Sequence, residues 1–408
     1  MVLPYSNGSY KSMKKLIHFI VFIILLLPAQ QLSAHNTFEK NVSTGSVPGK
    51  MDASEQLHGF TFVDCPQKPV PQFPYASEEV TFKNNKFNIQ LTGTLTVPQG
   101  NGPFPAVIMI TGSGLLIKDE DLIGNRTFLA ISDWLTRNGI AVLRYDSRDA
   151  AKSRQDYSSA TSADLATDAE AAFNFLRNNQ RINPKRIGLV GHGEGGLIAS
   201  IVASTNPDIA FIVSLAGPGV TGEQILCRQL EDTARLAGVT ETRIKESVAT
   251  HKNLYSVLKK ESDDRKAEVK IMEIYREALV KRTLSKEEMA KAISRLNGTF
   301  RASTYPWFRY FITTDAARSW KRVRCPVLAM NGEKDLQVSA HENLPAIEKA
   351  VKSSGNMAVK IIGLPGLNHL FQHCKTGLPS EYVQIEEPFS PEALKIISDW
   401  INGLKESR

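Results

Sequence analysis

The sequence predicts an α/β fold with a mostly parallel central sheet, helices on both faces of that sheet and an inserted helical segment. Short apolar runs alternate with amphipathic helical patterns along most of the 408 residues, which is typical of parallel sheets covered on both faces. Residues 187–200, IGLVGHGEGGLIAS, have the pattern of a buried strand, a glycine-rich turn and a helix. Residues 221–320 differ, because they are highly charged and helical in pattern without alternating strands.

Residues 1–34 have the pattern of a signal peptide. Two lysines at positions 14 and 15 precede an apolar run over 16–27 and a small-residue exit that ends at Ala34. The apolar run is too short to span a bilayer comfortably. Met13 opens the pattern directly and is an alternative start to Met1. We therefore expect an exported protein, periplasmic or extracellular, with no integral membrane segment after cleavage.

The charge pattern bears on nucleic-acid binding, and the cysteine pattern bears on disulfides. Cleavage after residue 34 removes three lysines and no acid, so the net charge falls from +7 to +4. No basic tract with interleaved aromatic residues is present, which argues against nucleic-acid binding. The four cysteines form no C-x-x-C motif; export permits disulfides in three pairings, and buried free thiols fit equally well. They are Cys65, Cys227, Cys325 and Cys374.

The first part of the predicted core covers residues 76–220. Residues 35–75, polar and rich in Pro, Ser and Gln, are expected to form a linker before it. Two β-like runs around Asn84-Asn85 predict a hairpin, and Gly139 marks the end of a helix. The expected strands are 78–83, 89–97, 106–110, 140–144, 187–190 and 209–215, and the expected helices are 128–137 and 163–178.

The helical insert and the second part of the core complete the chain. Residues 221–320 are expected to cap the carboxyl edge of the sheet, where α/β proteins bind ligands. Strands over 326–330 and 359–362 and a helix over 391–400 then form the second part of the core, residues 321–408.

The glycine-rich turn fits two different chemistries. As G-x-G-x-x-G, with Gly191, Gly193 and Gly196, it is a dinucleotide fingerprint. That interpretation needs an acidic residue at the end of the next strand, whereas Asp208 precedes that strand. As G-x-S-x-G it is a nucleophile elbow in which Gly193 stands where the serine belongs. Nicotinamide-dependent oxidoreduction therefore stays as a third alternative.

The hydrolase interpretation also needs an acid and a histidine after later strands. Asp335 follows the strand over 327–330, and His369 follows the strand over 359–362. An oxyanion hole needs backbone N–H groups from the residue after the nucleophile and from the loop after the first core strand. Glu194 and the loop that contains Ser113 and Gly114 occupy those places.

These motifs resemble the α/β-hydrolase esterases whose elbow reads G-H-S-E-G-G. The resemblance extends over almost all of the chain after residue 76, including GEKDLQV at 332–338, PGLNHLF at 365–371 and PSEY at 379–382. It implies the α/β-hydrolase fold with a helical cap, hydrolysis of small carboxylic esters through an acyl-enzyme, no cofactor, and Asp335 and His369 as acid and base.

The chain departs from that pattern at three places expected to face one pocket. Gly193 replaces the serine, residues 115–118 read LLIK instead of Pro-Gln-Asp-Arg, and residues 146–153 read DSRDAAKS instead of Asp-Asp-Arg-Gly and Gly-Val-Gly-Lys-Ser. Without the serine hydroxyl no acyl-enzyme forms at this position, so a directed water or Ser113 would have to act instead. Two functions follow: an ester hydrolase that is weak or uses an unusual nucleophile, and a non-catalytic protein that binds a small ester or acyl ligand. The pair His369 and His373 beside Cys374 has no carboxylate partner in its segment, so no metal is expected.

Overall fold

The computed structural model describes residues 73–112, 121–122, 125–148, 160–281, 287, 289 and 305–404. The predicted signal peptide, most of the predicted linker, and Ser113 and Gly114 lie outside the described residues. Among the described residues, no helix is both long and apolar enough to cross a membrane.

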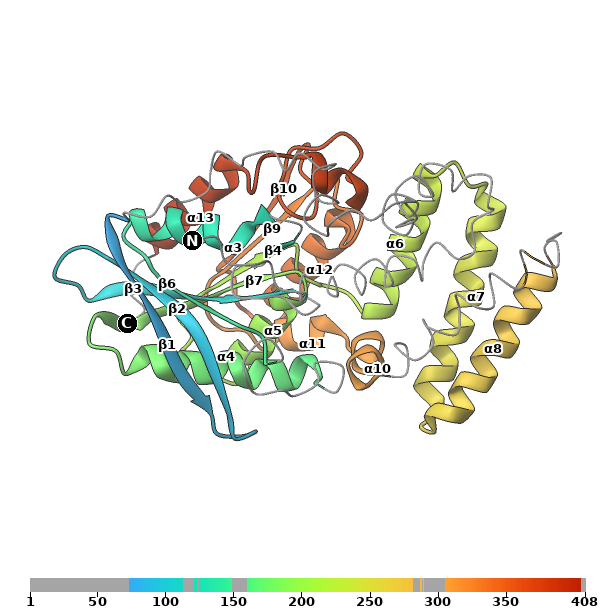
Figure 1. Cartoon of the computed structure of the whole chain (residues 1–408), viewed down its shortest axis with the longest axis horizontal. Helices are drawn as coiled ribbons and strands as arrows, with labels where there is room; N and C mark the ends of the chain where they lie inside the picture. Colours follow the sequence, from blue (N-terminus) through green and yellow to red (C-terminus); the bar gives the residue numbers. More distant parts are fainter. Residues whose placement is uncertain are drawn as a thin grey trace, which may run out of the picture.

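An eight-stranded sheet forms the centre of the molecule (Figure 1), with the order β1-β2-β6-β3-β7-β8-β9-β10. The pairs β1–β2 and β2–β6 are antiparallel, and every other neighbouring pair is parallel. The predicted hairpin is confirmed, although β1 begins at Tyr75 inside the predicted linker. The strands are β1 (Tyr75–Asn84), β2 (Ile89–Pro98), β3 (Phe104–Ile110), β6 (Ala141–Tyr145), β7 (Ile182–His192), β8 (Ile212–Leu215), β9 (Val327–Gly332) and β10 (Val359–Leu364). Two short strands, β4 (Asp121–Leu122) and β5 (Asn125–Arg126), pair separately.

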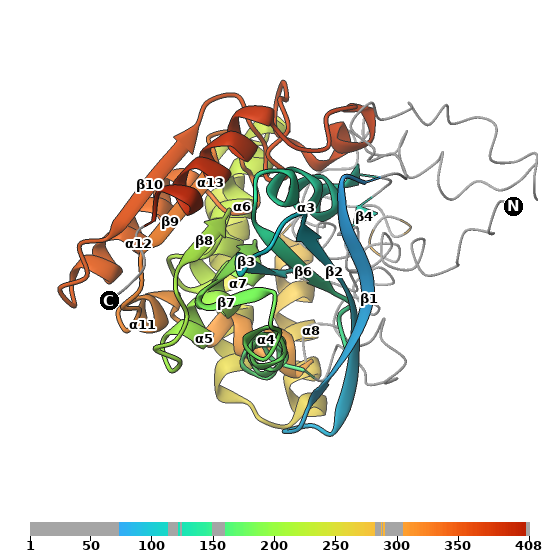
Figure 2. The ribbon, with the colours of Figure 1, turned by 90° about the vertical axis from the view of Figure 1, so that its left-hand side faces the viewer.

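Helices cover both faces of the sheet, as Figure 2 shows. One face packs on α4 (Ser162–Arg177), α5 (Glu194–Ala203), α11 (Ala316–Trp320) and α12 (Ala340–Lys352). The other face packs on α3 (Thr127–Arg137) and α13 (Pro391–Gly403). Alternate residues of β3 belong to the two cores: Ile108 lies in the first and Val107 in the second, both without solvent exposure. Burial on both faces explains why the strands are continuous apolar runs in the sequence.

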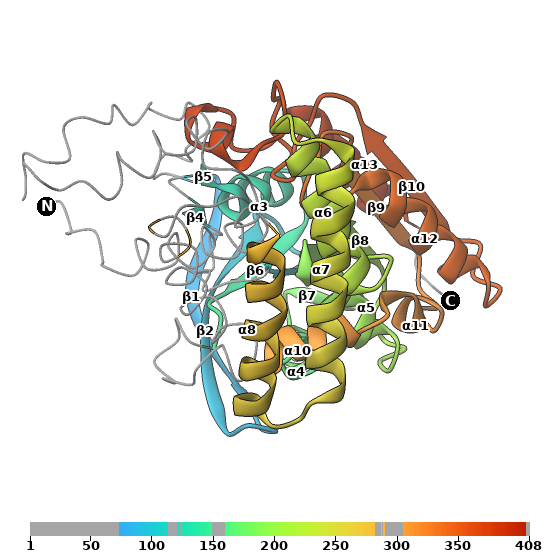
Figure 3. The ribbon, with the colours of Figure 1, turned by 90° about the vertical axis from the view of Figure 1, so that its right-hand side faces the viewer.

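Between β8 and β9, four of the described helices lie beside the sheet (Figure 3). Their apolar side chains form a separate cluster. These helices are α6 (Gly222–Leu236), α7 (Glu241–Lys260), α8 (Asp264–Val280) and α10 (Pro306–Thr313). The following helix α11 falls inside the predicted 221–320 insert, but its Trp320 is buried in the main core. The described helices of this cluster thus end at Thr313, whereas α11 packs against α5 and α12. The bounds 221–320 for the cap stay a prediction.

Candidate active site

Gly193 alone makes the turn between β7, which ends at His192, and α5, which begins at Glu194. Its backbone has φ 54° and ψ −122°, a positive φ that costs a residue with a Cβ free energy. The Gly193 N–H donates to the Leu215 carbonyl of β8 at 2.8 Å. The turn is thus tied to the neighbouring strand at the carboxyl edge of the sheet.

Gly191 and Gly195 allow β7, α5 and β3 to approach closely around this turn. A Cβ on Gly191 would lie 2.1 Å from the Gly195 carbonyl oxygen, and a Cβ on Gly195 would lie 2.1 Å from the Ile110 carbonyl oxygen. Both contacts are with backbone atoms, which do not move aside easily. The outer glycines of the motif are therefore required for packing, which is the role they have in a nucleophile elbow.

The loops after β9 and β10 bring Asp335 and His369 together. His369 Nδ1 lies 2.8 Å from Asp335 Oδ2, with 11% of the histidine side chain and 0% of the aspartate side chain exposed. The other carboxylate oxygen, Oδ1, accepts the backbone N–H groups of Gln337 at 2.7 Å and Val338 at 2.9 Å. Because these donors fix the carboxylate as an acceptor, we assign the imidazole proton to Nδ1. Nε2 is then the basic nitrogen.

His369 Nε2 faces the turn at Gly193. A Cβ built on Gly193 would lie 3.5 Å from Nε2, 3.7 Å from Cε1 of the same ring and 3.9 Å from the Gly112 Cα. These are ordinary van der Waals distances, so a Cβ at this position overlaps none of the described residues. Among the residues that the structure describes, none is a hydrogen-bond partner of Nε2. The three predicted site residues Gly193, Asp335 and His369 therefore lie together.

His192 contacts both the backbone and the ring of His369. Its Nε2 lies 2.9 Å from the His369 carbonyl oxygen, and the two ring centroids are 4.7 Å apart. This contact is between the last residue of β7 and the loop after β10. It is consistent with His192 as a packing residue rather than a second base.

The side chain of Glu194 makes a contact that the sequence analysis misses. Glu194 is 3% exposed, and its Oε1 accepts the Ser162 hydroxyl of α4 at 2.5 Å and the Trp307 indole N–H of α10 at 2.8 Å. The buried carboxylate thus joins a cap helix to the first residue of α5. Glu194 is predicted to contribute its backbone N–H to the oxyanion hole, and its predicted partners Ser113 and Gly114 lie outside the described residues.

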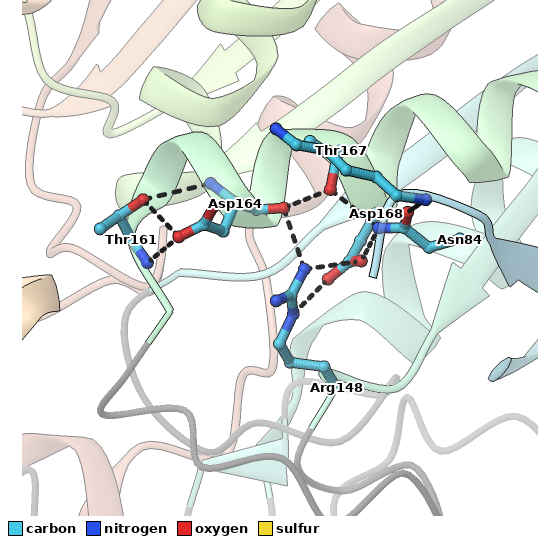
Figure 4. Close-up of polar contacts among 7 residues, drawn as sticks. Asn84, Arg148, Thr161, Asp164, Thr167 and Asp168 are labelled. Atoms are coloured by element: carbon cyan, nitrogen blue, oxygen red, sulfur yellow. Dashed lines mark hydrogen bonds and ion pairs between the residues drawn. The ribbon is translucent and has the colours of Figure 1, made fainter. Parts of the chain in front are cut away.

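A buried ion pair fixes the loop after β6 to α4, as Figure 4 shows. Arg148 Nε lies 2.9 Å from Asp168 Oδ2, with 3% and 2% of the two side chains exposed, and a second guanidinium nitrogen lies 2.9 Å from Oδ1. Asn84 Nδ2 also donates to Oδ1, at 2.6 Å, and the guanidinium lies 4.5 Å from the Phe87 ring centroid. Burial raises the pKa of Asp168 above its usual value, and the hydrogen bonds from Arg148 and Asn84 offset only part of this rise. Arg148 belongs to the departing segment 146–153, so part of that segment has a structural role.

The described part of the chain contains pairs of metal-ligating side chains but no larger group of them. No cluster of three or more His, Cys, Asp or Glu side chains there has the arrangement of a metal site. His373 pairs with Glu387 at 2.9 Å. Cys227, Cys325 and Cys374 are free thiols, and Cys65 lies outside the described residues.

A family model described as serine aminopeptidase, S33, of the Hydrolase_4 type, matches residues 125–373, more than half of the chain. The chain belongs to this family. It is an α/β-hydrolase, as the sequence analysis predicts, and the matched residues include the turn at Gly193 and both Asp335 and His369.

This S33-family chain is also similar to an esterase and to solved hydrolase structures. It is 27% identical to esterase EstD of Thermotoga maritima over 182 residues, which are 44% of this chain and 43% of that protein. The chain thus matches less than half the length of that curated relative. Esterase Pf2001 of Pyrococcus furiosus has a TM-score of 0.49 at 15% identity, over 86% of this chain and 100% of that one. The α/β-hydrolase GrgF of Penicillium sp. sh18 has a TM-score of 0.45 at 19% identity, over 72% and 91%.

Proposed function

We propose that this chain is a carboxylic-ester hydrolase scaffold that keeps the base and its orienting acid but lacks the nucleophile, so that its own turnover of small acyl esters is weak. The distance of 3.5 Å between a Cβ at position 193 and His369 Nε2 carries this proposal. A serine hydroxyl at that position would come within hydrogen-bonding reach of Nε2, about 2.6–3.2 Å, which is the geometry a base needs.

The remaining groups support only partial catalysis. His369 can take a proton from a water that attacks a bound ester, and Asp335 stabilises the imidazolium that forms. The amino end of α5 supports negative charge on the carbonyl oxygen. Serine hydrolases without their triad retain about 10³–10⁴-fold acceleration over water, far below the full enzyme. No cofactor takes part in this scheme.

The second candidate function is non-catalytic binding of a small ester or acyl ligand. The buried contact between Glu194 and Trp307 favours it, because it holds a cap helix beside the turn even without a nucleophile. The dinucleotide alternative receives no such support. Asp208, the acid considered for this role, lies before β8 instead of at its end. It forms an exposed ion pair with Arg177 at 2.9 Å.

Hydrolysis of p-nitrophenyl acetate tests the first candidate. We compare the unmodified protein, Gly193→Ser, and Gly193→Ser combined with His369→Ala. The serine variant is expected to exceed the unmodified protein by about 100-fold or more in kcat/KM, and the double variant to lose that gain. Turnover by the unmodified protein that equals that of the serine variant and depends on His369 would contradict the proposal. Equilibrium binding of an ester analogue without turnover would favour the second candidate.

We also propose export, on the signal-peptide pattern of residues 1–34. The mature protein, recovered from the medium or from the periplasm, is expected to begin at residue 35. Mass spectrometry of its N-terminal peptide measures this. An uncleaved N-terminus in the cytoplasm would contradict export.

A further inference from the structure

The space beside Gly193 accommodates a Cβ and is adjacent to an oriented base. Among the described residues, the three nearest heavy atoms to a Cβ at this position lie at 3.5–3.9 Å, and His369 Nε2 is the nearest of them. Asp335 holds the imidazole so that Nε2 is the nitrogen that faces this space. The His369 residue is 8% exposed. Among the described residues Nε2 has no hydrogen-bond partner, so it is available to a group that enters this space.

We propose that a hydroxyl group of the substrate itself occupies this space, and that the protein converts hydroxy esters to lactones. The inference rests on the proposed function, because it uses the same base and the same carbonyl site. The substrate class is an ester of an ω-hydroxy acid, whose terminal CH₂OH replaces the missing serine side chain atom for atom.

The reaction balances without a co-reactant. The hydroxyl proton moves to His369 Nε2 as the hydroxyl oxygen bonds to the ester carbonyl carbon, and Asp335 stabilises the imidazolium. The tetrahedral adduct then collapses, the bond to the leaving alkoxide breaks, and that alkoxide takes the proton from Nε2. The products are a lactone and an alcohol, and His369 is again neutral.

A substrate hydroxyl has two advantages over water here. It is tethered to the carbonyl that it attacks, and well-oriented intramolecular groups reach effective molarities of about 10⁵–10⁸ M. It also fills the space left by both Cβ and Oγ, whereas a water fills the place of the oxygen alone. The carbonyl would then lie at the amino end of α5, where positive partial charge favours the developing oxyanion.

Ethyl 5-hydroxypentanoate tests the inference, with ethyl pentanoate as the matched ester that lacks the hydroxyl. We expect the unmodified protein to form δ-valerolactone and ethanol at about 100-fold or more the rate of the His369→Ala variant, after subtraction of the reaction without protein. Ethyl pentanoate is expected to react far more slowly with the same protein.

The pair Gly193→Ala and Gly193→Ser separates this inference from the proposed function. Both variants place a Cβ in the space. Gly193→Ala is expected to lose lactone formation, and only the serine variant, which can form an acyl-enzyme, is expected to gain hydrolysis of ethyl pentanoate. Lactone formation at equal rates in the unmodified, His369→Ala and Gly193→Ala proteins, with the serine variant still hydrolysing ethyl pentanoate, would overturn the inference alone. A folded serine variant that hydrolyses neither ester would contradict the proposed function.

Discussion

Position 193 combines a catalytic location with a backbone conformation that suits glycine. Its φ of 54° carries little cost for glycine, whereas a residue with a Cβ pays about 1–3 kcal/mol in such a region. An active enzyme accepts that cost to point a hydroxyl at the base. With glycine at position 193, this chain has neither a hydroxyl nor that strain there.

We therefore predict that Gly193→Ser and Gly193→Ala both lower the free energy of unfolding by about 1–3 kcal/mol. Urea denaturation followed by circular dichroism measures the change. Gly403→Ala is the matched control, because no atom of the described residues lies within 4 Å of a Cβ there and its φ is not positive. We expect it to be neutral or slightly stabilising. Equal or greater stability of the two position-193 variants would refute the strain.

Asp335 and His369 could be predicted at the residue scale, because each follows an apolar strand and the ends of parallel strands share one edge. The role of the Glu194 side chain could not be predicted from the sequence. Its partner Trp307 is 113 residues away in sequence, on a helix whose position depends on how the cap packs. Nothing in the pattern of residues 187–200 indicates that contact.

At the scale of elements, the ion pair between Arg148 and Asp168 ties the loop after β6 to α4. Both side chains are almost fully buried. We predict that Arg148→Ala lowers the free energy of unfolding by about 3–5 kcal/mol, since it leaves the Asp168 carboxylate buried without its cation.

The control for this prediction is Arg177→Ala, which removes an exposed ion pair with Asp208 whose side chains are 53% and 54% exposed. Its expected cost is about 0–1 kcal/mol. Chemical denaturation of both variants gives the comparison. Similar losses for Arg148→Ala and Arg177→Ala would show that burial does not strengthen the Arg148 pair.

The contact between Glu194 and Trp307 is expected to hold α10 against the core. We predict that Trp307→Phe, which removes the N–H and keeps an aromatic ring, speeds amide hydrogen exchange in residues 305–313 while leaving α13 unchanged. Glu194→Ala should do the same, whereas Glu194→Gln keeps an oxygen that accepts both hydrogen bonds. Unchanged exchange in α10 after Trp307→Phe would contradict the role of this contact.

Most elements of the core could be predicted from hydrophobic periodicity, with boundaries that differ by a few residues. The helix α12 could not be predicted in this way, and no helix is expected from the sequence between β9 and β10. Pro345 lies inside it, and an interior proline argues against a helix. Burial of Leu344 and Ile347 against the core compensates for the backbone hydrogen bond that proline removes.

At the scale of the whole molecule, one apolar cluster covers each face of the sheet, and a third apolar cluster lies among the inserted helices. Alternation of strands and helices indicates covered faces, so the α/β-hydrolase fold could be predicted. The packing of α11 could not be predicted, because α11 has the same helical pattern as the helices before it. Only packing shows that its Trp320 belongs to the main core.

The central claim is that this fold holds a serine-hydrolase site complete except for one hydroxymethyl group. Covalent labelling with a fluorophosphonate, which phosphonylates an activated serine hydroxyl, tests it most directly by intact-protein mass spectrometry. We predict one adduct, located at position 193, on Gly193→Ser; none on the unmodified protein; and labelling slower by about 100-fold or more when His369→Ala is added. A folded Gly193→Ser protein that stays unlabelled, or labelling that does not depend on His369, would contradict the claim.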